Sequence, residues 1–392
     1  MAQLQRGLNV MLHRQRIALA CLALLYLSAP RAAVLPEDRA DILYHSYDGG
    51  GVTIAGPSVL ARKQIGSSAS VQANYYVDSV TSASIDVVTT ASSYTEERTE
   101  QSIGLDYLFD KTTLSGGYTN SEESDFSANT AYFSITQDFF GDLSTLTIGY
   151  ARGWDDVSRL DTEVGEIDRQ NLRVGLSQII NKNWIVSGNL ETITDEGFLN
   201  NPYRQVRYVD TTVPRGYSFE SEVYPRTRTS TAVSVTSLYY LQHRAAVRNI
   251  YRYFTDDWNI TAHTFELGYI HPLEGGWTFD FRWRHYRQDK AEFYSDLYPF
   301  QQAQNFLARD KELSTFTSNT LGAGFSLDMQ EAGINFVERG TLNAYVDYIV
   351  FDYDDFRDLR GSVNATSPAL VGNESLYSLD AVVLRLFFSV WF

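Results

Sequence analysis

Cysteine is almost absent from this chain, which has 392 residues and one cysteine, Cys21. Cys21 lies in an apolar stretch that we expect to be removed on export, so the mature chain would have no thiol. Such a chain can form neither a disulfide nor a cysteine-ligated metal site. A lipid anchor on Cys21 is not expected, because only about four apolar residues precede it, fewer than the 7–15 of a usual signal.

The N-terminus has the pattern of a secretory signal peptide. Arg6, Arg14 and Arg16 precede an apolar run over Ile17–Ala29, and small residues follow in SAPRAA, 28–33. A basic segment, an apolar core and small residues in this order predict export and cleavage. We therefore expect a signal peptide over residues 1–33, cleaved somewhere within 29–35, and a mature domain over 34–392.

Long hydrophobic runs are missing after residue 35, where no stretch approaches the roughly 18–20 apolar residues of a membrane helix. The mean hydropathy of the chain is −0.25. A membrane-spanning barrel can still have such a value, since its strands alternate apolar and polar residues. Basic charge is also scarce: 32 Lys and Arg against 48 Asp and Glu give a net charge of −16. This acidity argues against nucleic-acid binding, which needs a basic surface.

Period-two alternation runs through nearly the whole mature chain. In WTFDFRWR, 277–284, Trp277 and Phe279 share a parity opposite Asp280 and Arg282. The last eleven residues, VVLRLFFSVWF, place only apolar residues on one face and an Arg and a Ser on the other. Alternation of this kind predicts β-strands with one apolar face.

The links between the alternating segments are short and long in turn. Tight turns are expected at 66–69, 110–112, 141–143, 181–183, 242–244 and 274–276. Long links are expected at 82–97, 120–128, 154–166, 196–229, 290–311 and 354–374. Short periplasmic turns and long extracellular loops are typical of outer-membrane barrels. We predict an all-β fold: one transmembrane antiparallel up-and-down barrel of about 16 strands, with 14 as the alternative, beginning with a strand at 41–47.

Alternation also predicts which charged residues point into the barrel. The predicted lumen-lining residues are Arg62, Asp78, Asp106, Asp138, Arg169, Arg173, Glu191, Arg248, Arg252, Glu266, Asp280, Arg282, Arg284, Asp347 and Arg385. Acids and bases nearly balance in this set, so the negative excess is expected in loops such as 154–168 and 352–358. Two interpretations fit such a lumen. It could be an aqueous channel with an electric field across its width, or the interior of a closed barrel that ion pairs fill. The link 196–229 could fold inward as a constriction or plug.

No catalytic, cofactor or metal motif stands out. YHSYDGGG, 44–51, has glycines but no following Lys-Ser/Thr, so it predicts a hairpin at the first extracellular tip rather than a phosphate loop. Its members remain candidates for a specific contact: His45, Tyr47, Asp48, Gly49, Gly50 and Gly51. The histidines are scattered without a close pair, and there is no GxSxG motif. The acidic loops lack the spacing of a calcium loop. We expect no enzyme activity.

Four stretches resemble a known family: LYHSYDGGGVTIAGPSVLARK (43–63), NYYVDSVTSASIDVVTTASSY (74–94), GYTNSEE (117–123) and GYARGWDDV (149–157). They are similar to domain of unknown function 3570, a family of bacterial outer-membrane barrels, over about residues 40–392. The resemblance implies an outer-membrane location. The terminal Phe392 is similar to the signal read by the outer-membrane barrel assembly machinery, although Phe387 stands where that signal often has glycine.

These features together predict a porin-like channel that passes small solutes or ions. Outer-membrane lipid and lipopolysaccharide would surround the barrel. Members of the family tend to be encoded near small lipoproteins, thioredoxin-like proteins and flavin transferases. The alternative is therefore a largely closed barrel that anchors a periplasmic redox protein or lipoprotein.

Overall fold

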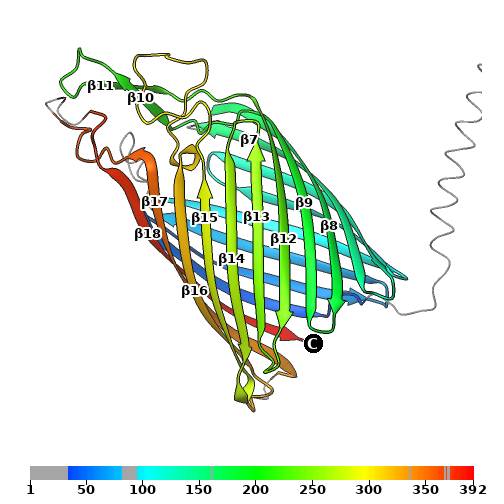
Figure 1. Ribbon diagram of the computed structural model, residues 1–392. Coiled ribbons are helices and arrows are strands. Elements are labelled where there is room, and N and C mark those ends of the chain that lie inside the picture. Colours follow the sequence, from blue (N-terminus) through cyan, green and yellow to red (C-terminus); the bar gives the residue numbers. More distant parts are fainter. Residues whose placement is uncertain (1–33, 82–94, 160–161, 335–336, 366–367, 369–370) are drawn as a thin grey trace, which may run out of the picture.

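The computed structural model describes residues 34–81, 95–159, 162–334, 337–365, 368 and 371–392. Within them, sixteen strands form one closed antiparallel barrel in which consecutive barrel strands pair and the first pairs with the last (Figure 1). A separate two-stranded hairpin stands in one connection. The predicted fold and the predicted number of 16 barrel strands are confirmed.

The barrel strands are 11 to 20 residues long. In chain order they are β1 Arg39–Gly49, β2 Val52–Ile65, β3 Ala69–Thr81, β4 Thr95–Phe109, β5 Thr112–Glu122, β6 Phe126–Phe139, β7 Ser144–Arg159, β8 Thr162–Asn181, β9 Trp184–Gly197, β12 Thr227–Tyr240, β13 Ala246–Asp256, β14 Thr261–Pro272, β15 Trp277–Gln288, β16 Phe316–Asp328, β17 Arg339–Arg357 and β18 Leu376–Trp391. The hairpin consists of β10 Gln205–Val209 and β11 Tyr217–Ser221.

The outer face of the barrel is apolar. Ile42, Ile103 and Leu321 are typical of the large side chains exposed around it. So wide an apolar surface is unfavourable in water, whereas bilayer lipid covers it. In the part of the chain that the structure describes, no helix has the length and apolar character needed to cross a membrane.

The first and last strands close the ring. β1 and β18 pair in one register from Arg39 opposite Trp391 to Gly49 opposite Ala381. The Trp391 ring lies between two guanidinium groups, with the Arg39 carbon 5.9 Å and the Arg339 carbon 4.5 Å from its centroid. Cation–π contacts of this kind favour the closed arrangement. Phe392 remains exposed beside the Lys63 ammonium, 4.9 Å from its ring.

Connection lengths differ between the two ends of the barrel (Figure 1). One end has the short links 66–68, 110–111, 140–143, 182–183, 241–245, 273–276 and the longer 329–338. The opposite end carries 198–226, 289–315 and 358–375. This agrees with the predicted alternation of short turns and long loops. The predicted link 82–97 falls largely outside the described residues.

Several predicted loops are strands instead. The link predicted at 120–128 shrinks to 123–125, and the link predicted at 154–166 lies almost wholly within β7 and β8. The acidic stretches 154–168 and 352–358 are likewise mostly strand, with Asp155 paired to Ile167 and Asp156 to Glu166. Backbone pairing needs no apolar side chains where a strand extends beyond the lipid and both faces meet water. Charge density was therefore a poor marker of loops here.

Gly56 stands where β2 comes closest to β3. The pairing of these strands skips Gly56 and Pro57, since it passes from Ala55 opposite Ser79 to Ser58 opposite Tyr76. A Cβ added to Gly56 would overlap the carbonyl group of Val77. Only glycine permits this backbone approach.

We predict that Gly56→Ala lowers the free energy of unfolding by ~1–3 kcal/mol, the usual cost of overpacking. Heat-modifiable gel mobility across a urea series measures it. Gly188→Ala is the matched control, because nothing lies within 4 Å of a Cβ there. Equal stability of the two variants would contradict the close approach.

Candidate functional site: the charged inner wall

The charged residues predicted to line the lumen occupy the inner parity of their strands. Arg173, for example, lies in β8 between Leu172 and Val174, and Leu172 belongs to the exposed apolar outer surface. The same alternation holds for Asp280 beside the outer Phe281, and for the other predicted residues. The inner wall therefore carries the charged groups, and the outer wall carries the apolar ones.

Most of these residues form ion pairs with residues of the adjacent strand or of the next strand but one. Arg173 Nε lies 2.7 Å from Glu191 Oε1, and Arg252 Nη2 lies 3.5 Å from Glu191 Oε2. The remaining pairs are Arg169–Asp195 at 2.6 Å, Arg248–Glu266 at 3.0 Å, and Arg282 and Arg385 each at 2.6 Å from Asp347. Each carboxylate thus compensates at least one nearby guanidinium group.

Five other predicted residues form no ion pair within the described part of the chain, and several of them contact neutral side chains instead. Asp106 accepts a hydrogen bond from Ser115 and Asp138 from Thr145, both at 2.6 Å. Arg62 donates to Gln72, and the Arg284 guanidinium lies 5.7 Å from the Tyr286 ring centroid. Asp280 lies near Arg248 and Arg282. These groups leave local charge on the wall that no partner cancels.

The carboxylates of these ion pairs are more deeply buried in the barrel wall than their guanidinium partners. The Arg173 side chain is 68% exposed and its partner Glu191 22%, while Arg169 is 49% exposed and its partner Asp195 16%. Asp347 is nearly buried between its two arginines. The acids therefore lie within the wall, and the arginines extend from it.

Three of the predicted acids lie on one arc of the ring, and two arginines that are themselves paired with carboxylates lie on the opposite arc. Asp78, Asp106 and Asp138 lie on β3, β4 and β6, whereas Arg248 and Arg252 lie on β13. In the closed order of sixteen strands, β13 is eight places from β3, so the two lie across the lumen from each other.

The sequence prediction missed several inner-wall charges. Arg98 contacts Glu100 at 2.7 Å, and Arg228 contacts Asp256 at 2.7 Å while lying 4.6 Å from the Trp258 ring centroid. Asp195 is a further one. Arg98 borders a segment that was expected to be a loop, Arg228 lies within another, and Asp195 lies past the expected end of its strand. Continued alternation would have found these positions.

The glycine-rich motif at 44–51 divides into separate parts. Gly50 and Gly51 form the tip of the β1–β2 hairpin with φ of 62° and 83°. Tyr47 has the inner parity of β1, and Asp48, on the outer parity, accepts a bond from Thr53 at 3.4 Å. His45 is not at the tip: its Nε2 lies 2.6 Å from Asp78 Oδ1, and its ring stacks on Tyr76 at 4.9 Å. The motif thus consists of an inner-wall contact at His45 followed by a turn at Gly50 and Gly51.

A family model described as "Protein of unknown function (DUF3570)" matches residues 88–348. The chain belongs to this family. The matched range contains the motifs at 117–123 and 149–157, whereas 43–63 lies outside it. No sequence match was found among curated proteins.

Solved structures with this fold include outer-membrane barrels. CdiB from Acinetobacter baumannii has a TM-score of 0.50 and 8% identity, over 90% of this chain and 60% of that one. A bacterial polysaccharide outer membrane secretin has 0.48 and 9%, over 92% and 100%. OccK2 (OpdF) of Pseudomonas aeruginosa, in complex with glucuronate, has 0.43 and 11%, over 92% and 99%. At these identities the likeness concerns the fold alone. The fold is that of bacterial outer-membrane β-barrels, so we call the long-loop end extracellular.

Two clusters bear on metal binding. The sequence prediction that no histidines lie close together is wrong, because the His243 and His271 rings are 5.3 Å apart and the Tyr269 hydroxyl lies 2.7 Å from His271 Nδ1. Among the described residues, ligand atoms of Glu96, Glu123 and Asp125 lie within 4.8 Å of one another. Burial, followed by the charge of Glu96, raises the pKa of both Glu123 and Asp125. Protonation therefore relieves the repulsion among them.

Three long loops pack together at the extracellular mouth, and we call them the cap: 198–226, 289–315 and the described residues of 358–375. The β10–β11 hairpin lies beyond the strand ends in Figure 1, so the described part of 198–226 does not descend into the barrel as a plug. Tyr208 bridges to Tyr298, and Val223 to Leu307. Tyr224, Trp258 and Phe293 form an apolar core beneath them. The cap is thus a packed unit at the mouth.

Arg207 connects the three loops from the centre of the cap, and its side chain is fully buried. It pairs with Asp296, and its Nη1 lies 2.6 Å from Glu374 Oε1. Arg309 Nη2 adds a contact of 2.9 Å to Asp296 Oδ1. Burial alone would raise the pKa of Glu374, but hydrogen bonds led by that from Arg207 outweigh it, so this pKa lies below its ordinary value. The charged pair therefore favours the docked cap.

Acid should loosen the cap. Since the pKa of Glu374 is lowered in the folded state, its stabilising contribution is present above the ordinary value of 4.5 and is lost as pH falls through the lower, folded value. We predict that amide exchange in 205–221, corrected for its intrinsic pH dependence, rises as pH falls below 4.5, the ordinary pKa of the carboxyl group.

Substitution of Glu374 gives the matching test at neutral pH. Glu374→Gln should weaken cap docking by about 3 kcal/mol, because it leaves Arg207 buried with less charge compensation. Glu292→Gln removes an exposed carboxylate of the same cap and should leave exchange unchanged. Equal protection of the 205–221 amides from exchange in both variants at pH 7 would contradict a stabilising role for the Arg207–Glu374 pair.

Proposed function

We propose that the chain is a porin-like channel through which small polar solutes and ions cross the outer membrane, after export and removal of the signal peptide. The exposure of the Arg173 guanidinium on the inner wall carries the proposal. A closed barrel filled by its own side chains would bury such a group, since an unshielded charge in a dry interior is costly. A barrel of about 16 strands is also wide enough to leave an aqueous lumen.

The exposed arginines of the inner wall support the same proposal. The guanidinium groups of Arg169 and Arg173 need water in the lumen to hydrate them. The ion pairs hold the long arginine side chains in place. In this proposal the chain carries out no chemistry and requires no cofactor, and lipid and lipopolysaccharide surround it in the membrane. The alternative, a scaffold for a periplasmic redox protein or lipoprotein, would follow from a silent, folded barrel.

Planar-bilayer recordings of the purified barrel should give stable current steps above the detergent control. Arg173→Glu should raise the preference for cations about fivefold, because it changes the wall charge by two units, each worth about 0.5 kcal/mol to an ion roughly 8 Å away in water. The reversal potential in a potassium chloride gradient measures this. Arg282 is a poorer choice than Arg173, since it also holds the nearly buried Asp347.

Arg152→Glu is the control for this experiment. Arg152 pairs with Asp168 on the outer parity of β7 and β8, so the same change of charge occurs outside the lumen. Its reversal potential should match that of the wild type. An equal shift in both variants would mean that Arg173 does not line the conducting path, and silence from heat-modifiable, folded protein would overturn the channel.

A further inference from the structure

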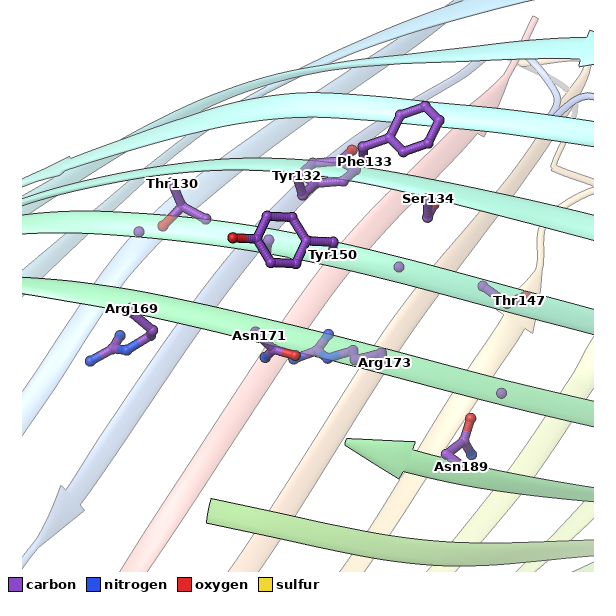
Figure 2. A pocket seen from close by; sticks show the side chains of 14 residues that line it. Thr130, Tyr132, Phe133, Ser134, Thr147, Tyr150, Arg169, Asn171, Arg173 and Asn189 are labelled. Carbon is purple, nitrogen blue, oxygen red and sulfur yellow. The ribbon is translucent and has the colours of Figure 1, made fainter. Parts of the chain in front are cut away.

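The inner wall has a hollow of about 510 Å³ between β6 and β9. Its floor consists of the small inner residues of β7, Gly149, Ala151 and Gly153. Thr130, Tyr132 and Ser134 line one side, and Arg169, Asn171 and Arg173 line the other, with Asn189 beside them (Figure 2). We call this hollow the β7 trough. We propose that it is a binding subsite for a small hydroxylated carboxylate on its way through the lumen, and this inference rests on the proposed function.

The charge of the trough carries the choice of an anion. Two arginines line it, and no carboxylate is among its lining residues. Glu191 and Asp195 lie behind the arginines, and each accepts from the Nε atom, at 2.7 Å from Arg173 and 2.6 Å from Arg169. Among the described residues, the Nη groups of Arg173 and Arg169 make no hydrogen bond. These are the donors that match a carboxylate.

The neutral lining residues fit the rest of such a solute. Within the described part of the chain, the side chains of Asn189, Thr130 and Ser134 form no hydrogen bond, so their polar groups can serve ligand hydroxyls. The Tyr132 ring gives a flat surface for an apolar edge. A volume of about 510 Å³ lies in the range of small-molecule sites.

The floor of the trough depends on the size of its residues. Gly149 pairs with Ser134 on one side and with Arg173 on the other. A Cβ at Gly149 would meet Ser134 Cβ at 3.5 Å and the Phe133 carbonyl oxygen at 3.9 Å, both ordinary contact distances. A valine there can therefore fit the strand while filling the space between the hydroxyl row and Arg173. This provides a variant that changes the shape of the trough without changing its charge.

Gluconate is a suitable probe, and sorbitol, which has a hydroxymethyl group in place of the carboxylate, is its neutral match. Calorimetric titration of the folded barrel in detergent, at one ionic strength, should show saturable binding of gluconate and none of sorbitol. Arg173→Ala should weaken gluconate binding about tenfold, as expected for a charged hydrogen bond. Gly149→Val should abolish it.

Arg284→Ala is the matched control. It removes the same unit of charge from the inner wall, but it lies on β15, outside the trough. Gluconate binding should remain within about twofold of the wild type, because the direct contact is preserved. Equal losses in Arg173→Ala and Arg284→Ala would reduce the effect to overall lumen charge and overturn the subsite. So would the absence of saturable gluconate binding by folded wild-type protein.

The binding measurement is independent of conductance. Gluconate binding by a barrel that is silent in bilayers would leave the subsite standing and overturn the channel. Current steps from a barrel that does not bind gluconate would support the channel and overturn the subsite. In the expected case, gluconate added to the bilayer chamber interrupts the wild-type current, and these interruptions disappear in Arg173→Ala but persist in Arg284→Ala.

Discussion

Pairing of backbone polar groups is the constraint on which this molecule depends. A strand that crosses hydrocarbon finds no water for its N–H and C=O groups, so each edge must be joined to another strand. The ring meets this requirement by pairing β1 with β18 over the full length of β1, from Arg39 to Gly49. Once the ring is closed, the side chains must separate into a lipid-facing and a lumen-facing set. The alternation of the sequence follows from that separation.

Closure also determines how charge can be held inside. Antiparallel neighbours bring inner residues of adjacent strands together, and the cross-strand pair of Arg173 and Glu191 is an example. Because carboxylates have shorter side chains than arginine, the acid lies in the wall and the guanidinium group reaches into the lumen. A nearly balanced set of residues can therefore present mainly positive groups to a passing solute. Overall charge and the charge that a solute meets are different quantities here.

The fold was predictable from the sequence because period-two alternation is a local signal. It gave the sixteen barrel strands, the short turns and the inner parity of Arg169 and Arg173. It failed where charge suggested loops, as at Asp155 and Asp156, since pairing in water requires no apolar residues. Alternation could not predict the cap, because the contact of Arg207 with Glu374 joins residues that lie 167 positions apart in the sequence. The β7 trough is similar: its shape comes from glycines on β7 facing polar rows on β6 and β8.

The cap and the trough are connected through one residue. A cavity of about 400 Å³ under the cap is lined by Arg169, Arg228 and Arg252 together with Leu313 of the cap. Arg169 also lines the trough. A solute entering beside the cap would thus meet arginines from the mouth to Arg173, together with the carboxylates Asp195, Asp310 and Glu312 of the cavity. The buried Arg207 network fixes the cap, and the wall carboxylates hold Arg169 and Arg173 through Nε, which leaves the Nη donors of these two arginines free of hydrogen bonds among the described residues. Rigid support and exposed charge are therefore compatible in the same wall.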